Sequence, residues 1–167
     1  MVEITDAEVQ EIDVAVVAYR DEGTWHLAEL PDEALGSVES IGQELRRYPD
    51  RDGALALISV AEDFSLLVRS RGAGAGVRVL LSDASAATDW HLARSATDHL
   101  GLEVEEDDED EVGPAGDLGI VSDLGVDATE MGELLDDDEL FPDEVLSEVA
   151  DAAGFGPRFD LLAGLED

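Results

Sequence analysis

Alternating hydrophobic and polar residues in the middle of the chain predict a β-hairpin. Hydrophobic residues occupy every second position in residues 64–68 and again in residues 77–81, which is the period of a strand with one buried face. The glycine-rich stretch 72–76 (GAGAG) lies between the two runs and permits positive φ wherever a turn needs it. Pairing Val68 with Val79 gathers the hydrophobic side chains of both strands on one face.

The same register has a consequence for the other face, where it sets Arg69 opposite Arg78. Two guanidinium groups facing each other across strands repel. Either carboxylates of this acidic chain cover the two arginines, or the arginines belong to a contact surface for another protein. The sequence leaves both interpretations open.

The rest of the first hundred residues repeats the strand and helix periods in the order β-β-α-β-β-β-α. The predicted elements are strands 12–19, 24–29 and 53–61, the two hairpin strands, and helices 37–48 and 83–100. Short turns between consecutive strands require antiparallel pairing. We therefore predict an α+β domain, residues 1–102, with a five-stranded antiparallel sheet whose helices cover one face. Strand 1 is expected beside strand 5, in the order 2-1-5-4-3 of profilin-like and roadblock-like domains, and Leu57 opposite Val68.

The last third of the chain has a different organisation. Residues 103–111 hold eight acids in nine positions, and such dense like charge opposes folding. We predict an acidic linker at 103–116 and a small all-helical C-terminal module at 117–167. Asp127 is a candidate helix cap, Pro142 a first helical residue and Gly154 a helix end. Phe141 is expected in the core of this module together with Phe155 and Phe159; a stripe that docks on a partner is the alternative.

Charge narrows the range of partners. The 167 residues include 43 acids and 9 bases, giving a net charge of −34, and every base is arginine. Residues 103–167 hold 24 of the acids and a single arginine, Arg158. Direct binding to nucleic acid or to a membrane is not expected, because phosphate groups are bound by clustered Lys and Arg. A basic protein partner fits the charge; solubility or adaptation to salt would explain it equally well.

Candidate chemistry is sparse. The sequence has no cysteine, no apolar run long enough to span a bilayer and no basic N-terminal region typical of a signal peptide, so we expect a cytoplasmic protein. His91 and His99 lie about two helical turns apart, too far to share a metal. Asp136 to Glu139 lack the alternating ligands and central glycine of a calcium loop. We therefore predict no catalytic, cofactor-binding or metal-binding residues, and no enzyme activity.

Several segments resemble the small bacterial family of tRNA adenosine deaminase-associated proteins. The segments that carry this resemblance are residues 62–69 (EDFSLLVR), 77–83 (VRVLLSD), Ala87, Asp89, Trp90, 116–119 (GDLG), 123–125 (DLG), 134–136 (LLD), 140–144 (LFPDE) and 154–156 (GFG). The resemblance covers most of the chain outside the acidic linker. It implies association with a tRNA adenosine deaminase, in tRNA modification, and carries no catalytic residues with it.

Together these observations predict a non-enzymatic accessory or regulatory protein that binds a basic partner, plausibly a tRNA adenosine deaminase. The expected partner-binding residues are Asp107, Asp108, Asp110, Asp136, Asp137, Asp138, Glu139, Arg69 and Arg78. Two other functions stay open: a nucleic-acid mimic that inhibits a different basic protein, and a profilin-like domain that senses a small ligand. A homodimer is also open.

Overall fold

The computed structural model describes residues 12–48, 54–61, 63–70, 77–88, 90–101, 114–137 and 139–163. It contains one antiparallel sheet of six strands in the order β2-β1-β3-β4-β5-β6. The strands are β1 (Ile12–Asp21), β2 (Thr24–Glu29), β3 (Leu55–Val60), β4 (Phe64–Ser70), β5 (Val77–Leu81) and β6 (Ala115–Gly116).

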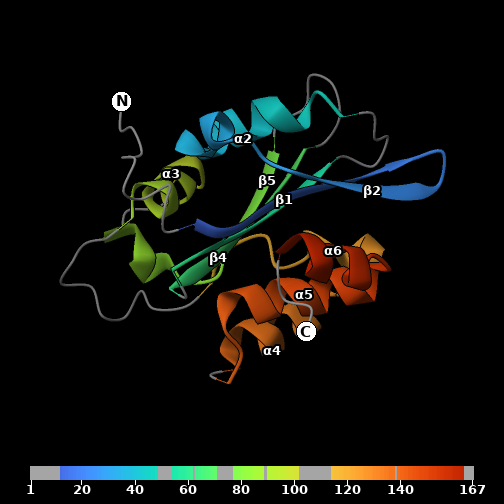
Figure 1. Ribbon diagram of the computed structural model, residues 1–167. Coiled ribbons are helices and arrows are strands. Elements are labelled where there is room, and N and C mark those ends of the chain that lie inside the picture. Colours follow the sequence, from blue (N-terminus) through green and yellow to red (C-terminus); the bar gives the residue numbers. More distant parts are fainter. Residues whose placement is uncertain are drawn as a thin grey trace.

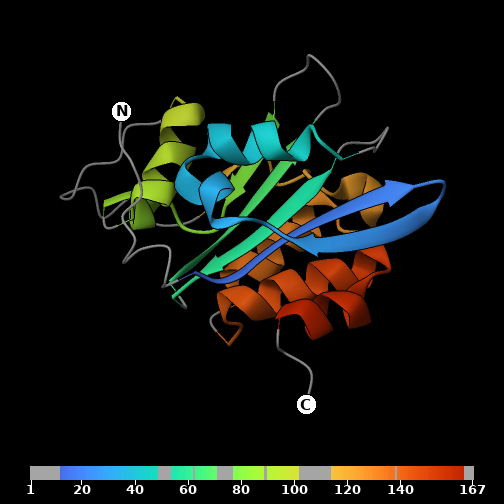
Figure 2. The same cartoon turned by 45° about the horizontal axis from the view of Figure 1, so that its top comes forward.

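Helices lie on both sides of this sheet (Figures 1 and 2). The first side carries α2 (Val38–Leu45) and α3 (His91–His99), and the second carries α4 (Ala128–Asp136), α5 (Pro142–Ala153) and α6 (Gly156–Ala163). Short 3-10 helices span Asp32–Gly36, Ala84–Thr88 and Ser122–Leu124. The prediction that the helices of residues 1–102 cover one face is confirmed by α2 and α3, and the C-terminal helices cover the other face.

The two faces of the sheet build two separate hydrophobic cores because side chains alternate along each strand. Val17, Leu66 and Leu81 belong to the core under α2 and α3. Val16 and Leu80 belong to the second core, which also contains Val149, Phe155 and Phe159 from the C-terminal helices. Every residue of β3 and β4 is buried, as expected for central strands covered on both sides.

The predicted hairpin is confirmed, including Val68 opposite Val79 and Arg69 opposite Arg78. The predicted register between β3 and β4 is wrong by one residue: Leu57 lies opposite Leu67 instead of Val68. The connection from Val60 to Phe64 has three residues where a two-residue turn was expected. A one-residue shift moves a side chain to the other face, so Leu57 belongs to the second core.

The predicted strand order is also wrong. Strand β1 pairs with β3 instead of β5, and β5 pairs with a sixth strand, Ala115–Gly116, at the end of the stretch predicted as linker. The order therefore differs from the 2-1-5-4-3 arrangement expected from profilin-like domains. Antiparallel neighbours that follow one another along the chain need only short connections, and β3, β4 and β5 meet this condition.

Local signals in the C-terminal part were more reliable. The Asp127 carboxylate accepts a hydrogen bond of 2.9 Å from the Glu130 backbone N–H at the start of α4, Pro142 is the first residue of α5, and Gly154 ends α5 with φ +103°. Phe155 and Phe159 are buried, as predicted. Phe141 was expected in the core but is 54% exposed, because it stands at the N-cap of α5 just before the helix.

Candidate functional site

The two arginines of the hairpin lie on the face of the sheet that the C-terminal part covers. Arg69 on β4 is only 3% exposed, and its guanidinium binds Asp123 through two parallel contacts of 2.5 and 2.8 Å. It also donates a 2.9 Å hydrogen bond to the backbone carbonyl of Ile120. This forked geometry matches the planar arginine head to a carboxylate.

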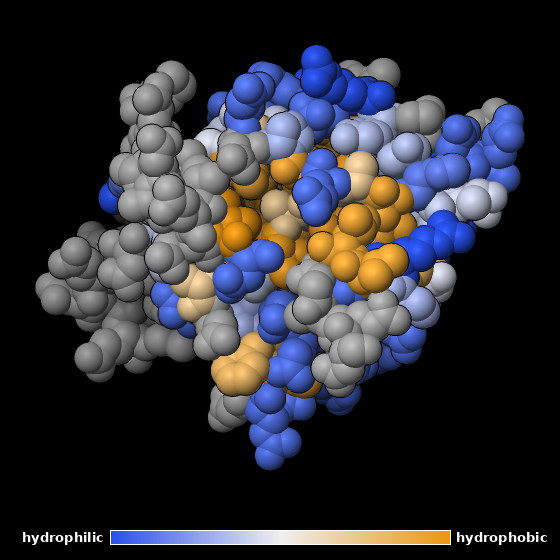
Figure 3. All heavy atoms as spheres, in the orientation of Figure 1, coloured by the Kyte–Doolittle hydropathy of each residue, from blue (hydrophilic) through white to orange (hydrophobic). Residues whose placement is uncertain are grey.

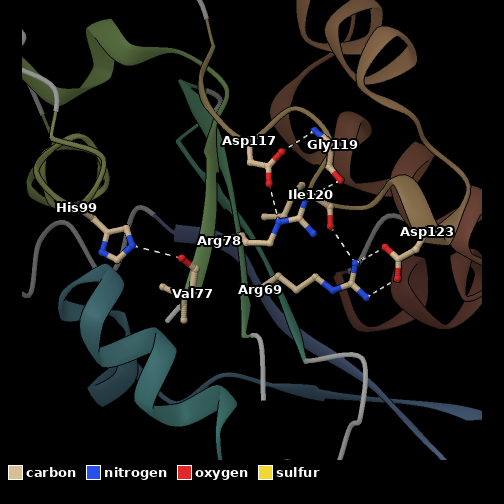
Figure 4. Close-up of polar contacts among 8 residues, drawn as sticks. All are labelled: Arg69, Val77, Arg78, His99, Asp117, Gly119, Ile120 and Asp123. Carbon is tan, nitrogen blue, oxygen red and sulfur yellow. Dashed lines mark hydrogen bonds and ion pairs between the residues drawn. The ribbon is translucent and has the colours of Figure 1, made fainter. Parts of the chain in front are cut away.

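Arg78, on the neighbouring strand β5, also binds a carboxylate and a backbone carbonyl of the C-terminal part (Figure 4). Arg78 on β5 donates through Nε to Asp117 at 2.5 Å and through Nη2 to the Gly119 carbonyl at 2.9 Å. The second Asp117 oxygen accepts a 2.9 Å hydrogen bond from the Gly119 N–H. We call Arg69, Arg78, Asp117 and Asp123 the arginine cluster; it joins the segment 117–123 to the sheet.

The arginine cluster answers the question that the sequence left open about how the like charges are compensated. Carboxylates of the same chain, Asp117 and Asp123, bind the two guanidinium groups. Arg69 is buried in this arrangement, so its side chain presents almost no surface to another molecule. The role of Arg69 and Arg78 in partner binding stays a prediction, and we do not include them in the surface proposed below.

The arginine cluster makes stability sensitive to acid. The hydrogen bonds from Arg69 are the largest cause that lowers the pKa of Asp123, and they outweigh the opposing effect of partial burial. A lowered pKa in the folded state stabilises the fold above the ordinary aspartate pKa of about 4, and this contribution is lost as the pH falls through the lower, folded value. We expect the difference in unfolding free energy between wild type and Asp123→Asn to be constant above about pH 5 and to shrink below about pH 4. Urea unfolding of both proteins from pH 7 to pH 3 measures it, and a difference that grows on acidification would contradict it.

The predicted acidic residues fall into two groups. Asp107, Asp108, Asp110 and Asp138 lie outside the described residues. Asp136, Asp137 and Glu139 are exposed at the junction of α4 and α5, where the Asp137 carboxylate accepts a 2.9 Å hydrogen bond from the Glu139 N–H. The structure thus brings the second group together in one turn.

Further exposed carboxylates lie along the same C-terminal segment. They come from the loop before α4, from α4 and from α5, and the whole set is Asp123, Asp127, Glu130, Glu133, Asp136, Asp137, Glu139, Glu144, Glu148 and Asp151. We call this set the acidic surface. Phe141 lies within it, two residues after Glu139, with more than half of its side chain exposed. Sequence reasoning missed Phe141 as a surface residue; its place directly before Pro142, outside the helical repeat, is the signal that could have revealed it.

Histidines and carboxylates of the described residues are not gathered into a metal site. No group of three or more His, Asp or Glu side chains among the described residues is placed to hold a metal ion. His26 stacks on Tyr19, and His99 lies 3.4 Å from the carbonyl oxygen of Val77 (Figure 4). Across the described ranges, no helix is both long and apolar enough to cross a bilayer.

Comparison with known proteins gives the family. The family model described as Rv3753c-like tRNA adenosine deaminase-associated protein matches residues 13–156. Protein Rv3753c of Mycobacterium tuberculosis (strain ATCC 25618 / H37Rv) is 37% identical over 151 residues, which cover 89% of this chain and 85% of the relative. No solved structure gives a significant match. The family match extends from β1 to the start of α6, so it includes the sheet, the arginine cluster and the acidic surface. The chain belongs to the Rv3753c-like family of tRNA adenosine deaminase-associated proteins.

Proposed function

We propose that this protein is a non-enzymatic accessory protein that binds a tRNA adenosine deaminase through its acidic surface. The observation that carries the proposal is the concentration of exposed carboxylates on one layer of the fold. Ten exposed acidic residues form the acidic surface, whereas Arg158 is the only basic residue from 103 to the end of the chain. Such a surface attracts a basic partner and accelerates its association.

Phe141 adds an exposed aromatic side chain to the acidic surface. Binding energy at protein interfaces is concentrated in a few buried aromatic and arginine side chains, surrounded by a polar rim. Phe141 is 54% exposed and lies between the acidic turn at 136–139 and the first turn of α5, where the Glu144 carboxylate accepts a hydrogen bond from the Phe141 N–H. It would supply the aromatic side chain, and the carboxylates around it would face arginines or lysines of the partner.

The choice of partner follows from two independent considerations. The family is named for association with tRNA adenosine deaminase. An enzyme that holds tRNA needs a basic surface for the phosphates, and that surface is complementary in charge to the one described here. An acidic protein bound there would either compete with tRNA or keep the enzyme in a complex.

The expected result is a complex that weakens steeply with salt. Calorimetry or surface plasmon resonance with the tRNA adenosine deaminase of the same cell should show a Kd that rises markedly between roughly 50 and 500 mM salt, because salt screens exposed charges. The triple variant Asp136→Asn, Asp137→Asn, Glu139→Gln should weaken binding about tenfold at low salt, since exposed ion pairs contribute roughly 0.2–1 kcal/mol each.

A control variant shows whether binding depends on the acidic surface or only on the net charge of the protein. The variant Asp21→Asn, Glu39→Asn, Asp98→Asn also removes three exposed carboxylates, but from the β1–β2 turn and from α2 and α3. It should bind almost as well as wild type. Equal losses in both triple variants, or a Kd that salt does not change, would contradict the proposal. Capture of a different basic protein in place of the deaminase would favour the nucleic-acid mimic instead.

A further inference from the structure

Among the strands that the structure describes, β2 has a neighbour on one side only, which leaves an edge of the sheet open. It pairs with β1 on one side and stands at the end of the strand order, and the β1–β2 hairpin projects beyond the helices (Figures 1 and 2). The Leu30 N–H donates to the Ala15 carbonyl at 3.0 Å, and bonded pairs alternate in an antiparallel ladder. The backbone groups of Trp25, Leu27 and Glu29 therefore point away from β1, toward the open edge.

Helix α6 extends this edge with an apolar surface. Arg158 donates a hydrogen bond to the Trp25 carbonyl, which places the first turn of α6 beside β2. One turn further along the helix, Leu161 is 69% exposed and Leu162 is 37% exposed; of the described residues, only these two and Phe141 are large exposed hydrophobics. Figure 3 shows hydrophobic residues gathered in the middle of this face, where Figure 1 places β1 and β2 between α2 and α6.

We propose that the β2 edge and the exposed leucines of α6 form a homodimer interface. Two copies of β2 would pair antiparallel about a two-fold axis at Leu27, so that Trp25 of one copy lies opposite Glu29 of the other. Leu27 would then exchange both backbone hydrogen bonds with the other copy, and the Trp25 carbonyl, which already accepts from Arg158, would use its second lone pair for the Glu29 N–H of the other copy. The α6 helices of both copies would lie on the same side of the continuous sheet, and their leucines would cover one another.

Glu29 and Arg158 have opposite charges and both lie along this edge. Trp25, Leu27 and Glu29 alternate with their neighbours and so share one face of β2, the face on which Trp25 and Leu27 pack against the second core. Arg158 reaches the strand from the same side. In the proposed register, Glu29 of one copy would approach Arg158 of the other, twice by symmetry. A two-fold interface needs this kind of self-complementarity, whereas a basic strand would meet Arg158 as a like charge.

Sedimentation equilibrium of the full chain tests the proposal. At roughly 50 µM protein the wild type should show a mass near twice 17.8 kDa, and added salt should strengthen the dimer, because salt screens the repulsion between two chains of net charge −34. This is the opposite of the salt effect expected for the deaminase complex, so each proposal can fail without the other.

Variants locate the interface. Leu161→Asp should raise the dissociation constant at least about tenfold, whereas Ala128→Asp, which adds the same charge on α4, an element outside the proposed interface, should leave the constant close to that of wild type. Glu29→Arg and Arg158→Glu should each weaken the dimer, and the double exchange should restore it. A wild type that stays monomeric at high salt, as it would if another part of this chain covered the edge, overturns the proposal. So does a dimer that Leu161→Asp leaves unchanged.

Discussion

Replacing Gly116 by alanine is expected to destabilise the fold by about 3 kcal/mol or more, through strain at a residue that only glycine suits. Gly116 has φ +111°, and a Cβ atom built there would lie 2.1 Å from the backbone carbonyl oxygen of Val79. Neither the strand β5 nor its pairing partner can move away without breaking the contact between them, in which the Asp117 N–H donates to the same Val79 carbonyl at 2.9 Å. Chemical denaturation of wild type and variant measures the loss.

Gly132 provides the matched control for this prediction. It lies inside α4, and a Cβ atom there meets nothing within 4 Å. Gly132→Ala should therefore stabilise the protein by roughly 0.5–1 kcal/mol, since glycine loses more conformational freedom in a helix than alanine does. If Gly116→Ala changes the unfolding free energy in the same direction and by a similar amount as Gly132→Ala, the close approach of β6 to β5 does not affect stability. In that case the connection between the segment 114–117 and the sheet is looser than the geometry indicates.

Sequence reasoning succeeded where the determinants are local. The pairing of β4 with β5 follows from the two-residue period and the glycine-rich turn, and it is confirmed residue by residue. The cap at Asp127 and the helix end at Gly154 depend on their immediate neighbours, and both are confirmed. The Trp90 indole, which packs against the first core, donates its N–H to the Asp63 carboxylate at 2.8 Å, as a packed indole requires.

Sequence reasoning failed where two segments far apart in the chain must find each other. The choice of β3 over β5 as the neighbour of β1 depends on the total packing of the sheet, because hydrophobic patterns on β3 and β5 are both compatible with a central partner. The β3–β4 register depends on one extra residue in a loop. Ala61 in that loop has φ +50°, a conformation that its sequence gives no reason to expect.

The hairpin arginines show a further limit of this kind. Their like charge on one face signalled that something must compensate them, and the sequence offered 43 carboxylates without distinguishing among them. Asp123 lies 54 positions after Arg69, and Asp117 lies 39 positions after Arg78. Since the helices of the C-terminal part also form a core with the sheet, these ion pairs are part of a larger contact that only the folded chain reveals.

A second large loss of stability is expected at the Arg69–Asp123 pair. Removing Asp123 should cost more unfolding free energy than removing Arg69. The Arg69 side chain is 4% exposed, whereas the Asp123 side chain is 53% exposed. Removing Asp123 leaves a buried guanidinium without its carboxylate, which costs roughly 3 kcal/mol or more. Removing the charge of Arg69 leaves a carboxylate that water can reach, so the cost should be smaller, about 1–2 kcal/mol, mainly for the lost hydrogen bond to the Ile120 carbonyl.

A double-mutant cycle in urea tests this asymmetry. Arg69→Met keeps an unbranched apolar side chain without the guanidinium, Asp123→Ala removes the carboxylate, and the double variant removes both. We expect Asp123→Ala to be the less stable of the single variants and the double variant to be close to Arg69→Met, because a methionine beside an alanine leaves no buried charge unpaired. The corresponding cycle at Arg78 and Asp117, whose side chains are 25% and 39% exposed, should give a smaller difference between its single variants. If the two single variants at 69 and 123 are equally stable, burial of the Arg69 guanidinium does not decide the energetics of the Arg69–Asp123 pair.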